Sequence, residues 1–497
     1  MNKPRFSRKD FSSIDLYEVA RRVLLRYGFL PKFPSRLRRQ VQQLKNRSEE
    51  GGRIDPSLRD LRELLWSSID NLESLDLDQL EYCEQAPGRE IRALVAIADV
   101  DLYVDQGSGL DRHAAHNGSS LYLGIKVFSM LPDELSTNLS SLNEGEDRLA
   151  IVIEFFVRRD GSVRAGEVFR ALVHNKAKLV YESVGDWLEG KAPIPEKVHQ
   201  THGLENQLRL QDEAASRLRQ YRLEKGAVEL ETIEPVPIIK NGKVVDLVVR
   251  HKNRARFLIE NFMIAANGAM VGFLEKKGSP MIHRVVRTPE RWSRIVDVAA
   301  EYGEKLPESP DPFALSEFMI KMEERDSAHF PDLSLSIVKL LGSGEYVLAE
   351  PGKPRLGHFG LSVHDYTHST APNRRYVDLI IQRLLKAVLV KRPTPYTKRE
   401  LMDYASWCTE RDQSSKKVER FMRKVLAAML LSERLGEVFD AIVTGVSDKG
   451  TFARLMSPPA EGRIMEKEQG LDVGQKIRAR LISLDPENGF IDFERVG

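Results

Sequence analysis

The segment Ser68-Ile-Asp70-Asn-Leu-Glu-Ser-Leu-Asp76-Leu-Asp78-Gln79 precedes the apolar run Ile91-Arg-Ala-Leu-Val-Ala-Ile-Ala-Asp99, and these two stretches decide the fold. The apolar run predicts a strand that is buried on both faces. The first segment places three carboxylates, those of Asp70, Asp76 and Asp78, within nine residues. Like charges held this close favour a bound cation, and hard oxygen ligands suit magnesium or manganese. A solvated acidic turn is the alternative that the pattern alone leaves open.

Length and composition indicate an ordinary soluble protein with several domains. The chain has 497 residues, of which 41% are hydrophobic and 30% are charged, so we expect two to four domains. Cys83 and Cys408 are its only cysteines, which excludes a disulfide framework and a cysteine-based metal site. The polar N-terminus and the lack of an apolar run of about 18 residues argue against a secretion signal or a membrane span. We therefore expect a cytoplasmic protein.

The N-terminal part of the chain is basic. Residues 1–50 carry 13 Lys and Arg against 5 Asp and Glu, although the whole chain has a net charge of only +2. Apolar spacing predicts an amphipathic helix over 14–28 and a second helix over 36–44, followed by a polar linker over 46–57. We interpret residues 1–60 as a basic helical module that could attract phosphates. A solvated helical surface is an equally good interpretation of this charge.

The rest of the chain predicts a mixed body and a small barrel. Residues 61–434 alternate strands, including hairpins around 159–162 and 240–242, with long helices such as the apolar one over 253–277. This order of elements favours an α+β catalytic domain. Residues 435–497 instead predict short strands at 437–443, 451–455, 475–484 and 489–493. This series of short strands indicates a small OB-type barrel, a fold that commonly binds single-stranded nucleic acid.

Motifs along the chain give the acidic cluster a family context. The pattern D-x5-D-x-D-Q followed by Val95-Ala-Ile-Ala-Asp99 resembles the catalytic signature of the ribonuclease II family. Further blocks agree in the same order along residues 60–497. They are Ser119-Ser-Leu-Tyr122, Met130-Leu-Pro-Asp-Glu-Leu-Ser136, Lys176-Ala-Lys-Leu-Val-Tyr181, Glu260-Asn-Phe-Met-Ile-Ala-Ala-Asn267, His358-Phe-Gly360 and Pro372-Asn-Arg374-Arg-Tyr376-Val-Asp378.

The resemblance implies both the fold and the activity. It implies an α+β ribonuclease II-type catalytic domain with an N-terminal helix-turn-helix-like module and a shortened C-terminal OB barrel that binds RNA. It also implies a magnesium-dependent, hydrolytic 3′-to-5′ exoribonuclease, with manganese as an alternative metal. Such an enzyme would act as a monomer without membrane contact, thread single-stranded RNA and release nucleoside 5′-monophosphates.

Four residues match the catalytic and metal-binding positions of the family, and a fifth such position holds Gln79. By resemblance, Asp70 and Asp76 are metal ligands, and Asp78 is both a ligand and the acid most directly tied to cleavage. Arg374 matches the arginine that faces the scissile phosphate, and a planar guanidinium with paired donors suits that role. An ion pair between Arg374 and Asp378 is the structural alternative. Gln79 departs from the family, whose members often have a fourth Asp there, although its amide oxygen can still reach a metal or water.

Other residues match the family's contacts to RNA. Tyr181 matches the aromatic on which the last bases stack. The family's second stacking aromatic falls near Val228, an aliphatic residue, so one half of this clamp is expected to be missing and the length of the final product is left open. Glu260 and Glu419 match residues that contact the sugars near the 3′ end, where the 2′-hydroxyl distinguishes RNA from DNA.

Two departures from the family carry their own hypotheses. The amide at Gln79 removes one negative charge, for which Glu73 or Asp99 could compensate, and it raises the alternative of a catalytically inactive RNA-binding or regulatory homologue. About 60 residues cannot hold the two cold-shock barrels of the best-known members. We therefore expect a wider approach to the channel and some ability to degrade structured RNA.

Overall fold

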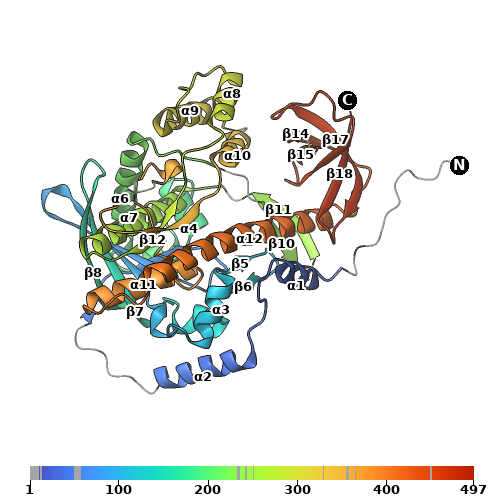
Figure 1. The fold of residues 1–497 in the computed structure, drawn as a ribbon. Helices are drawn as coiled ribbons and strands as arrows, with labels where there is room; N and C mark the ends of the chain where they lie inside the picture. The colour runs from blue at the N-terminus through green and yellow to red at the C-terminus, as the bar shows by residue number, and fades with distance from the viewer. Residues whose placement is uncertain are drawn as a thin grey trace.

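The computed structural model describes residues 11, 14–49, 58–231, 235–240, 243–249, 251–327, 330–353, 357–363, 365–447 and 450–496. Most of the predicted linker over 46–57 lies outside these ranges, as does the predicted turn at 241–242. The catalytic body and the C-terminal barrel are joined by one long helix that crosses the molecule (Figure 1).

A seven-stranded sheet forms the centre of the catalytic body. Its strands follow the order β1 (Arg59–Asp60), β8 (Val163–His174), β7 (Asp147–Val157), β4 (Ile91–Ala98), β3 (Gln79–Gln85), β2 (Ser67–Asp70) and β9 (Ala177–Val180). β4 lies in the middle and pairs antiparallel with β3 and β7. Seven of its eight residues are buried, so the predicted two-faced strand is confirmed.

A tight hairpin joins β7 to β8 where the sequence predicts it. Gly161 lies in the turn with φ of +80°, a conformation that residues with a Cβ rarely adopt. A Cβ at this position would also lie 2.0 Å from the carbonyl oxygen of Arg217. The turn therefore requires glycine for both conformation and space.

Long helices cover the sheet. α6 (Leu204–Glu224) packs on β3, β4 and β7, and α7 (Arg254–Lys276) packs on β7 and β8. Asn253 caps α7, because its side chain accepts a hydrogen bond from the backbone nitrogen of Arg256 over 3.0 Å. Of the helices that the structure describes, α7 alone is long and apolar enough to cross a membrane. However, 67% of the 18-residue apolar stretch of α7 is buried inside the protein, as in a core helix.

The remaining elements surround this sheet and its helices. α11 (Tyr376–Leu389) and α12 (Lys398–Leu430) pack together, and α12 starts with a capping box formed by Thr397 and Glu400. The other helices are α3 (Gly109–Asn117), α4 (Tyr181–Leu188), α5 (Glu196–Gln200), α8 (Trp292–Glu301), α9 (Pro312–Arg325) and α10 (Phe330–Leu341). Three two-stranded sheets pair β5 (Leu121–Tyr122) with β6 (Val127–Phe128), β10 (Pro235–Lys240) with β11 (Lys243–Val249), and β12 (Met281–Val285) with β13 (Glu345–Ala349).

The C-terminal strands close into a barrel. Their order is β14 (Val438–Ser447), β15 (Gly450–Leu455), β16 (Glu461–Glu466), β18 (Phe490–Arg495) and β17 (Lys476–Asp485). The predicted barrel is confirmed, but β16 is a strand that the sequence pattern did not predict separately. This strand alternates buried Gly462 and Ile464 with exposed charged residues, so its apolar signal is short.

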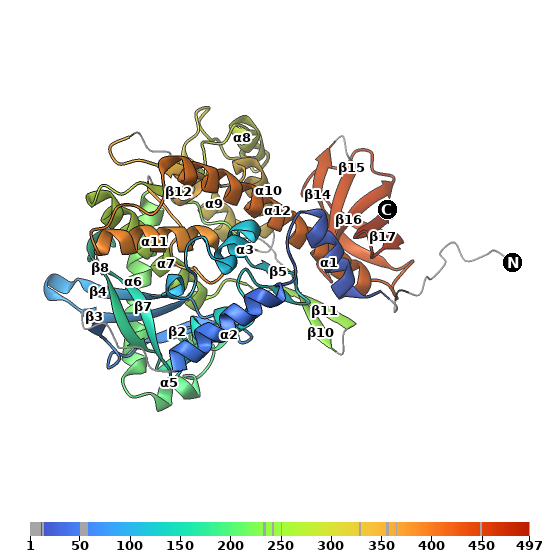
Figure 2. The same cartoon turned by 60° about the horizontal axis from the view of Figure 1, so that its bottom comes forward.

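The two N-terminal helices bury their apolar faces against the catalytic body. α1 (Leu16–Arg26) joins a cluster with α12 and the β5–β6 hairpin, and it lies beside the barrel in Figure 2. α2 (Ser35–Glu49) inserts Leu37 and Val41 into the main core. It lies at the bottom of the body in Figure 1 and comes forward in Figure 2. The helices that the sequence predicts as a small module thus share two larger cores.

Candidate active site

The carboxylates of the acidic segment gather at one end of two neighbouring strands. Asp70 is the last residue of β2, and Asp78 directly precedes Gln79, the first residue of β3. Because β2 and β3 are adjacent and antiparallel, the end of β2 lies next to the start of β3. Asp76 belongs to the connection between the two strands. Chain topology therefore brings together the three acids that the sequence predicts as metal ligands.

Asp78 is held by a loop almost 300 residues later in the chain. Its Oδ1 accepts a hydrogen bond from the backbone nitrogen of Asn373 over 3.0 Å. Its Oδ2 accepts one from Nε of Arg374 over 3.1 Å. Asp78 is 1% exposed, whereas 44% of the Arg374 side chain is accessible. The buried carboxylate thus orients a guanidinium that remains open to a ligand.

The other two nitrogens of Arg374, Nη1 and Nη2, make no hydrogen bond within the part of the chain that the structure describes. The alternative of an ion pair with Asp378 is wrong, because that acid binds Arg375 instead. Nε and Nη2 of Arg375 lie 2.9 and 2.8 Å from the two oxygens of Asp378. Arg374 therefore keeps two nitrogens available to a ligand, whereas Arg375 stabilises the loop.

Burial raises the pKa values of two of the acids, Asp70 and Asp78. It raises the pKa of Asp78 to about 7, although Arg374 opposes the shift, and the negative charge of Asp76 adds to it. Burial likewise raises the pKa of Asp70 to about 6. Asp76 is half-buried, and its Oδ2 accepts a hydrogen bond from the hydroxyl of Tyr122 over 3.0 Å.

These residues fit a divalent cation. The Oδ2 atom of Asp70 is buried and has no hydrogen-bond partner among the described residues. A buried carboxylate oxygen without a partner is costly, and a metal ion would satisfy it. Asp70, Asp76 and Asp78 supply the hard oxygen donors that magnesium and manganese prefer. Burial and the negative charge of Asp76 raise the pKa values of Asp70 and Asp78, and a bound cation would lower both of them.

The suggested compensation for Gln79 by Asp99 is not supported. Asp99 is buried, its Oδ1 lies 2.5 Å from Nζ of Lys386, and its Oδ2 lies 3.2 Å from Arg170. Two cations already neutralise this acid. Glu73 lies on the wall of the adjacent cavity, and Gln79 itself is 7% exposed.

A cavity of about 1050 Å³ extends from the acidic cluster. Its wall includes Asp76 and Tyr122, and also Tyr181, Glu260 and Glu419, the three residues that the sequence predicts as RNA contacts. Tyr181 comes from α4, Glu260 from α7 and Glu419 from α12. Residues from segments far apart in the chain therefore converge on one hollow.

Strand geometry explains why Tyr181 lies at the acidic end of this cavity. β9 runs parallel to β2, with Val180 opposite Asp70, and Tyr181 follows directly. The guanidinium of Arg256 lies over the Tyr181 ring at 4.4 Å from its centroid, and Nη2 of Arg256 donates to Oδ1 of Asn71 over 2.9 Å. The sequence reasoning missed Arg256, which fixes the ring beside the acidic cluster.

Val228, the aliphatic residue near which the family's second stacking aromatic falls, does not line the cavity. Val228 is 8% exposed and packs in the apolar cluster of α8, α9 and α10. Leu230, two residues later, lines the cavity together with Tyr181. Whether residue 228 or residue 230 faces the cavity depends on the local conformation of this segment. The sequence pattern does not determine that conformation. The position is aliphatic in either case.

Glu260 forms an ion pair with Lys252, whose Nζ lies 3.0 Å from Oε2. Lys252 and Arg423 line the same cavity, so its wall combines acids with cations. Acceptors suit ribose hydroxyls and cations suit phosphates.

Two further groups of polar residues were not recognised from the sequence. Glu81 on β3 is fully buried, and neither of its carboxyl oxygens has a hydrogen-bond partner among the described residues. Burial and the charge of Asp70 raise the pKa of Glu81 well above its usual range. Elsewhere, Glu275, His283 and Asp365 offer ligand atoms within 4.8 Å of one another, although none lines the cavity. Their spacing along the chain carries no metal-site signal.

Comparison with known proteins shows where this architecture occurs. Residues 58–391 match the RNB domain, and residues 437–496 match the RNase II-type exonuclease C-terminal S1 domain. Ribonuclease R of Thermotoga maritima is 28% identical over 498 residues, which cover 93% of this chain and 68% of that protein. Ribonuclease R of Escherichia coli is 30% identical over 446 residues, which cover 85% of this chain and 52% of that protein.

A solved structure shares the fold. Mycoplasma genitalium RNase R in complex with ribose methylated single-stranded RNA matches with a TM-score of 0.86 at 23% identity, covering 97% of this chain and 78% of that one. The chain thus spans about half to two thirds of the length of the curated relatives above.

Proposed function

Because the chain belongs to the ribonuclease II (RNB) family, we propose that it is a magnesium-dependent exoribonuclease that hydrolyses RNA from the 3′ end to nucleoside 5′-monophosphates. The family match supports the predicted class of enzyme, an exoribonuclease-type hydrolase. The metal, the products and the roles of individual residues belong to the proposal.

The pairing of Asp78 with Arg374 supports this proposal most directly, because the guanidinium lies near Asp76 and Tyr122, two residues of the cavity wall that Tyr181 also lines. Asp70, Asp76 and Asp78 would hold the metal, with Gln79 as a further oxygen donor. Bound divalent cations supply an activated water and neutralise charge that develops on phosphorus. Asp78 fixes Nε of Arg374, so the remaining nitrogens can face the equatorial oxygens of the scissile phosphate.

The cavity would hold the 3′ end of the strand. The Tyr181 ring offers a stacking surface for a terminal base, and Glu260 and Glu419 offer acceptors for 2′-hydroxyl groups. Stacking tolerates any base, which suits an enzyme that removes nucleotides one after another. The RNA bound to the Mycoplasma genitalium relative supports this choice of substrate.

We extend the proposal to a monomeric cytoplasmic enzyme that uses magnesium or manganese, contacts no membrane and also degrades structured RNA. Both cysteines are buried and free, which fits a reducing compartment.

Product analysis tests the chemistry. Poly(A) is incubated with the protein and magnesium in heavy-oxygen water, and the products are identified by mass spectrometry. Hydrolysis predicts adenosine 5′-monophosphate with one heavy oxygen on its phosphate. Nucleoside diphosphates formed only with added phosphate, or unlabelled monophosphate, would contradict the proposed reaction.

A further inference from the structure

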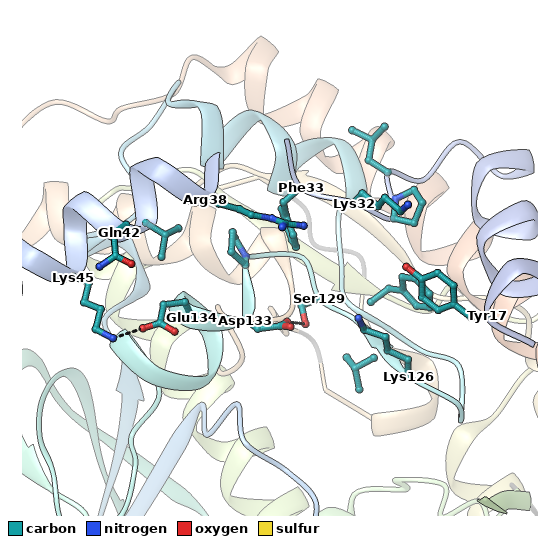
Figure 3. Close-up of a pocket in the computed structure, with 16 residues that line it drawn as sticks. Tyr17, Lys32, Phe33, Arg38, Gln42, Lys45, Lys126, Ser129, Asp133 and Glu134 are labelled. Atoms are coloured by element: carbon teal, nitrogen blue, oxygen red, sulfur yellow. Dashed lines mark hydrogen bonds and ion pairs between the residues drawn. The ribbon is translucent and has the colours of Figure 1, made fainter. Parts of the chain in front are cut away.

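A second cleft lies between the N-terminal segment and the catalytic body. We call it the N-terminal cleft; its volume is about 570 Å³. One side comes from α1, the connection after it and α2, and the other side comes from β6 and the turn that follows. The residues labelled on its walls in Figure 3 are Tyr17, Lys32, Phe33, Arg38, Gln42, Lys45, Lys126, Ser129, Asp133 and Glu134.

The N-terminal cleft has an excess of positive charge. Lys32, Arg38 and Lys126 are exposed, and none of them forms an ion pair within the described ranges of the chain. Figure 3 shows Lys32 and Arg38 on one side of the hollow and Lys126 on the other. Cations on facing walls concentrate field in the space between them and attract an anion.

The two acids of the cleft are already engaged. Oε1 of Glu134 lies 2.9 Å from Nζ of Lys45, and Oδ1 of Asp133 accepts a hydrogen bond from the Ser129 hydroxyl over 2.9 Å. The Lys45–Glu134 pair also ties α2 to the catalytic body. The Ser129 hydroxyl carries no charge, so Asp133 still offsets one cation. The four cations on the walls therefore exceed the two acids by two charges.

Aromatic rings lie beside these cations. Tyr17 stacks on Phe128 with ring centroids 5.8 Å apart, and Nζ of Lys126 lies 5.9 Å from the Tyr17 centroid. Tyr17 and Phe33 are half-buried, so part of each ring is accessible. Aromatic surfaces interleaved with cations are the combination that binds single-stranded nucleic acid without sequence preference.

The N-terminal cleft adjoins the catalytic cavity. Lys126 and Val127 line both hollows. They belong to the β5–β6 hairpin, whose other strand carries Tyr122, the residue bound to Asp76. One hairpin thus separates the acidic site from the N-terminal cleft, and its turn faces both.

We propose that the N-terminal cleft binds the sugar-phosphate backbone of the RNA strand on the 5′ side of the segment held in the catalytic cavity. This inference rests on the proposed function, which places the 3′ end of the strand near Asp78. The cations come from three separate segments rather than from one cage. That arrangement suits phosphates spaced along a strand better than a single phosphate ion.

The structure provides a matched pair of variants. Lys32→Ala/Arg38→Ala removes two charges from the cleft wall. Arg36→Ala/Arg39→Ala also removes two charges, and both of these arginines are exposed on α2 but do not line the cleft. Because all four side chains are exposed, both variants should fold, and equal melting temperatures check this.

Binding is measured without turnover, in the Asp78→Asn background with magnesium and again in otherwise unmodified protein with EDTA. The probes are labelled oligo(A) strands of about 30 and about 4 nucleotides, the shorter one comparable to a single binding site. For the long strand, Lys32→Ala/Arg38→Ala should weaken affinity about tenfold relative to Arg36→Ala/Arg39→Ala. Loss of two phosphate contacts should reduce the slope of log K against log salt by about 1.4. Affinity for the short strand should stay unchanged.

Equal affinities of the two double variants for the long strand would overturn the proposal, and so would an equal loss on the short strand. If the unmodified protein neither binds nor shortens RNA, the proposed function itself fails. If it shortens RNA while the two variants bind alike, only the N-terminal cleft proposal fails.

Discussion

Nε of Arg374 donates to Oδ2 of Asp78 over 3.1 Å, across 296 residues of sequence. Asp78 is buried and Arg374 is partly exposed, so the buried carboxylate holds the guanidinium in one orientation. The neighbouring Arg375 makes a similar contact with buried Asp378. Two consecutive arginines therefore differ: the Arg374 side chain is partly exposed, whereas the Arg375 side chain is paired with a buried acid of the fold.

Substitution of the two arginines should separate those tasks. In Arg374→Lys, one ammonium cannot both bind Asp78 and present paired donors to phosphate, so kcat should fall about 10²- to 10³-fold. Its melting temperature should change little. Arg375→Lys should instead lower the melting temperature, because the buried Asp378 loses a bidentate partner. Steady-state kinetics and thermal unfolding check both, and an unchanged kcat in Arg374→Lys would refute its role.

Metal binding should depend on pH. The pKa values of Asp70 and Asp78, about 6 and about 7, exceed those of unfolded aspartate. The native metal-free protein then binds more protons than the unfolded chain, so its stability falls as pH rises from about 4 to about 7. Magnesium favours the ionised acids, and it should raise the melting temperature more at about pH 8 than at about pH 5.5. An equal increase at both pH values would argue against this site.

A carboxylate at position 79 should strengthen the metal site. Gln79→Asp restores one negative charge beside Asp78, so the magnesium concentration for half-maximal activity should fall several-fold. Gln79→Ala, which lacks the amide oxygen, should raise it. Activity measured across a magnesium titration compares the three proteins. Identical titrations would place residue 79 outside the metal site.

Stacking of a terminal RNA base on the Tyr181 ring should be measurable as binding affinity. Tyr181→Ala should weaken binding of short RNA by about 1–3 kcal/mol, whereas Tyr181→Phe should preserve it. Leu230→Phe adds a ring on the same cavity and should tighten binding and change the length of the final product. Fluorescence anisotropy and product sizing measure these effects. Equal affinity of Tyr181→Ala and Tyr181→Phe would contradict the stacking role.

The sequence predicted the features that depend on local pattern. The apolar run of β4, the hairpin at Gly161 and the apolar helix α7 follow from hydrophobic period and turn chemistry. The acidic cluster was visible because its members lie within nine residues. The position of Arg374 came from resemblance to a family, since spacing carries no information across 296 residues.

Residues that act through tertiary packing were missed. Arg256 and Leu230 reach the cavity from segments whose periodicity gives no sign of a shared hollow. Asp99 looked available for a metal because its partners, Lys386 and Arg170, are remote in sequence. Glu81 was not recognised because an isolated glutamate in a strand normally faces solvent, whereas tertiary packing buries this one.

The most direct test of the account is the fate of 5′-labelled poly(A) incubated with the protein and magnesium. Metal-dependent degradation from the 3′ end predicts a ladder of progressively shorter 5′-labelled strands. This ladder should disappear with EDTA and in Asp78→Asn. RNA that stays intact but is retained with the protein on a filter would contradict this prediction and would identify a binding protein built on this fold.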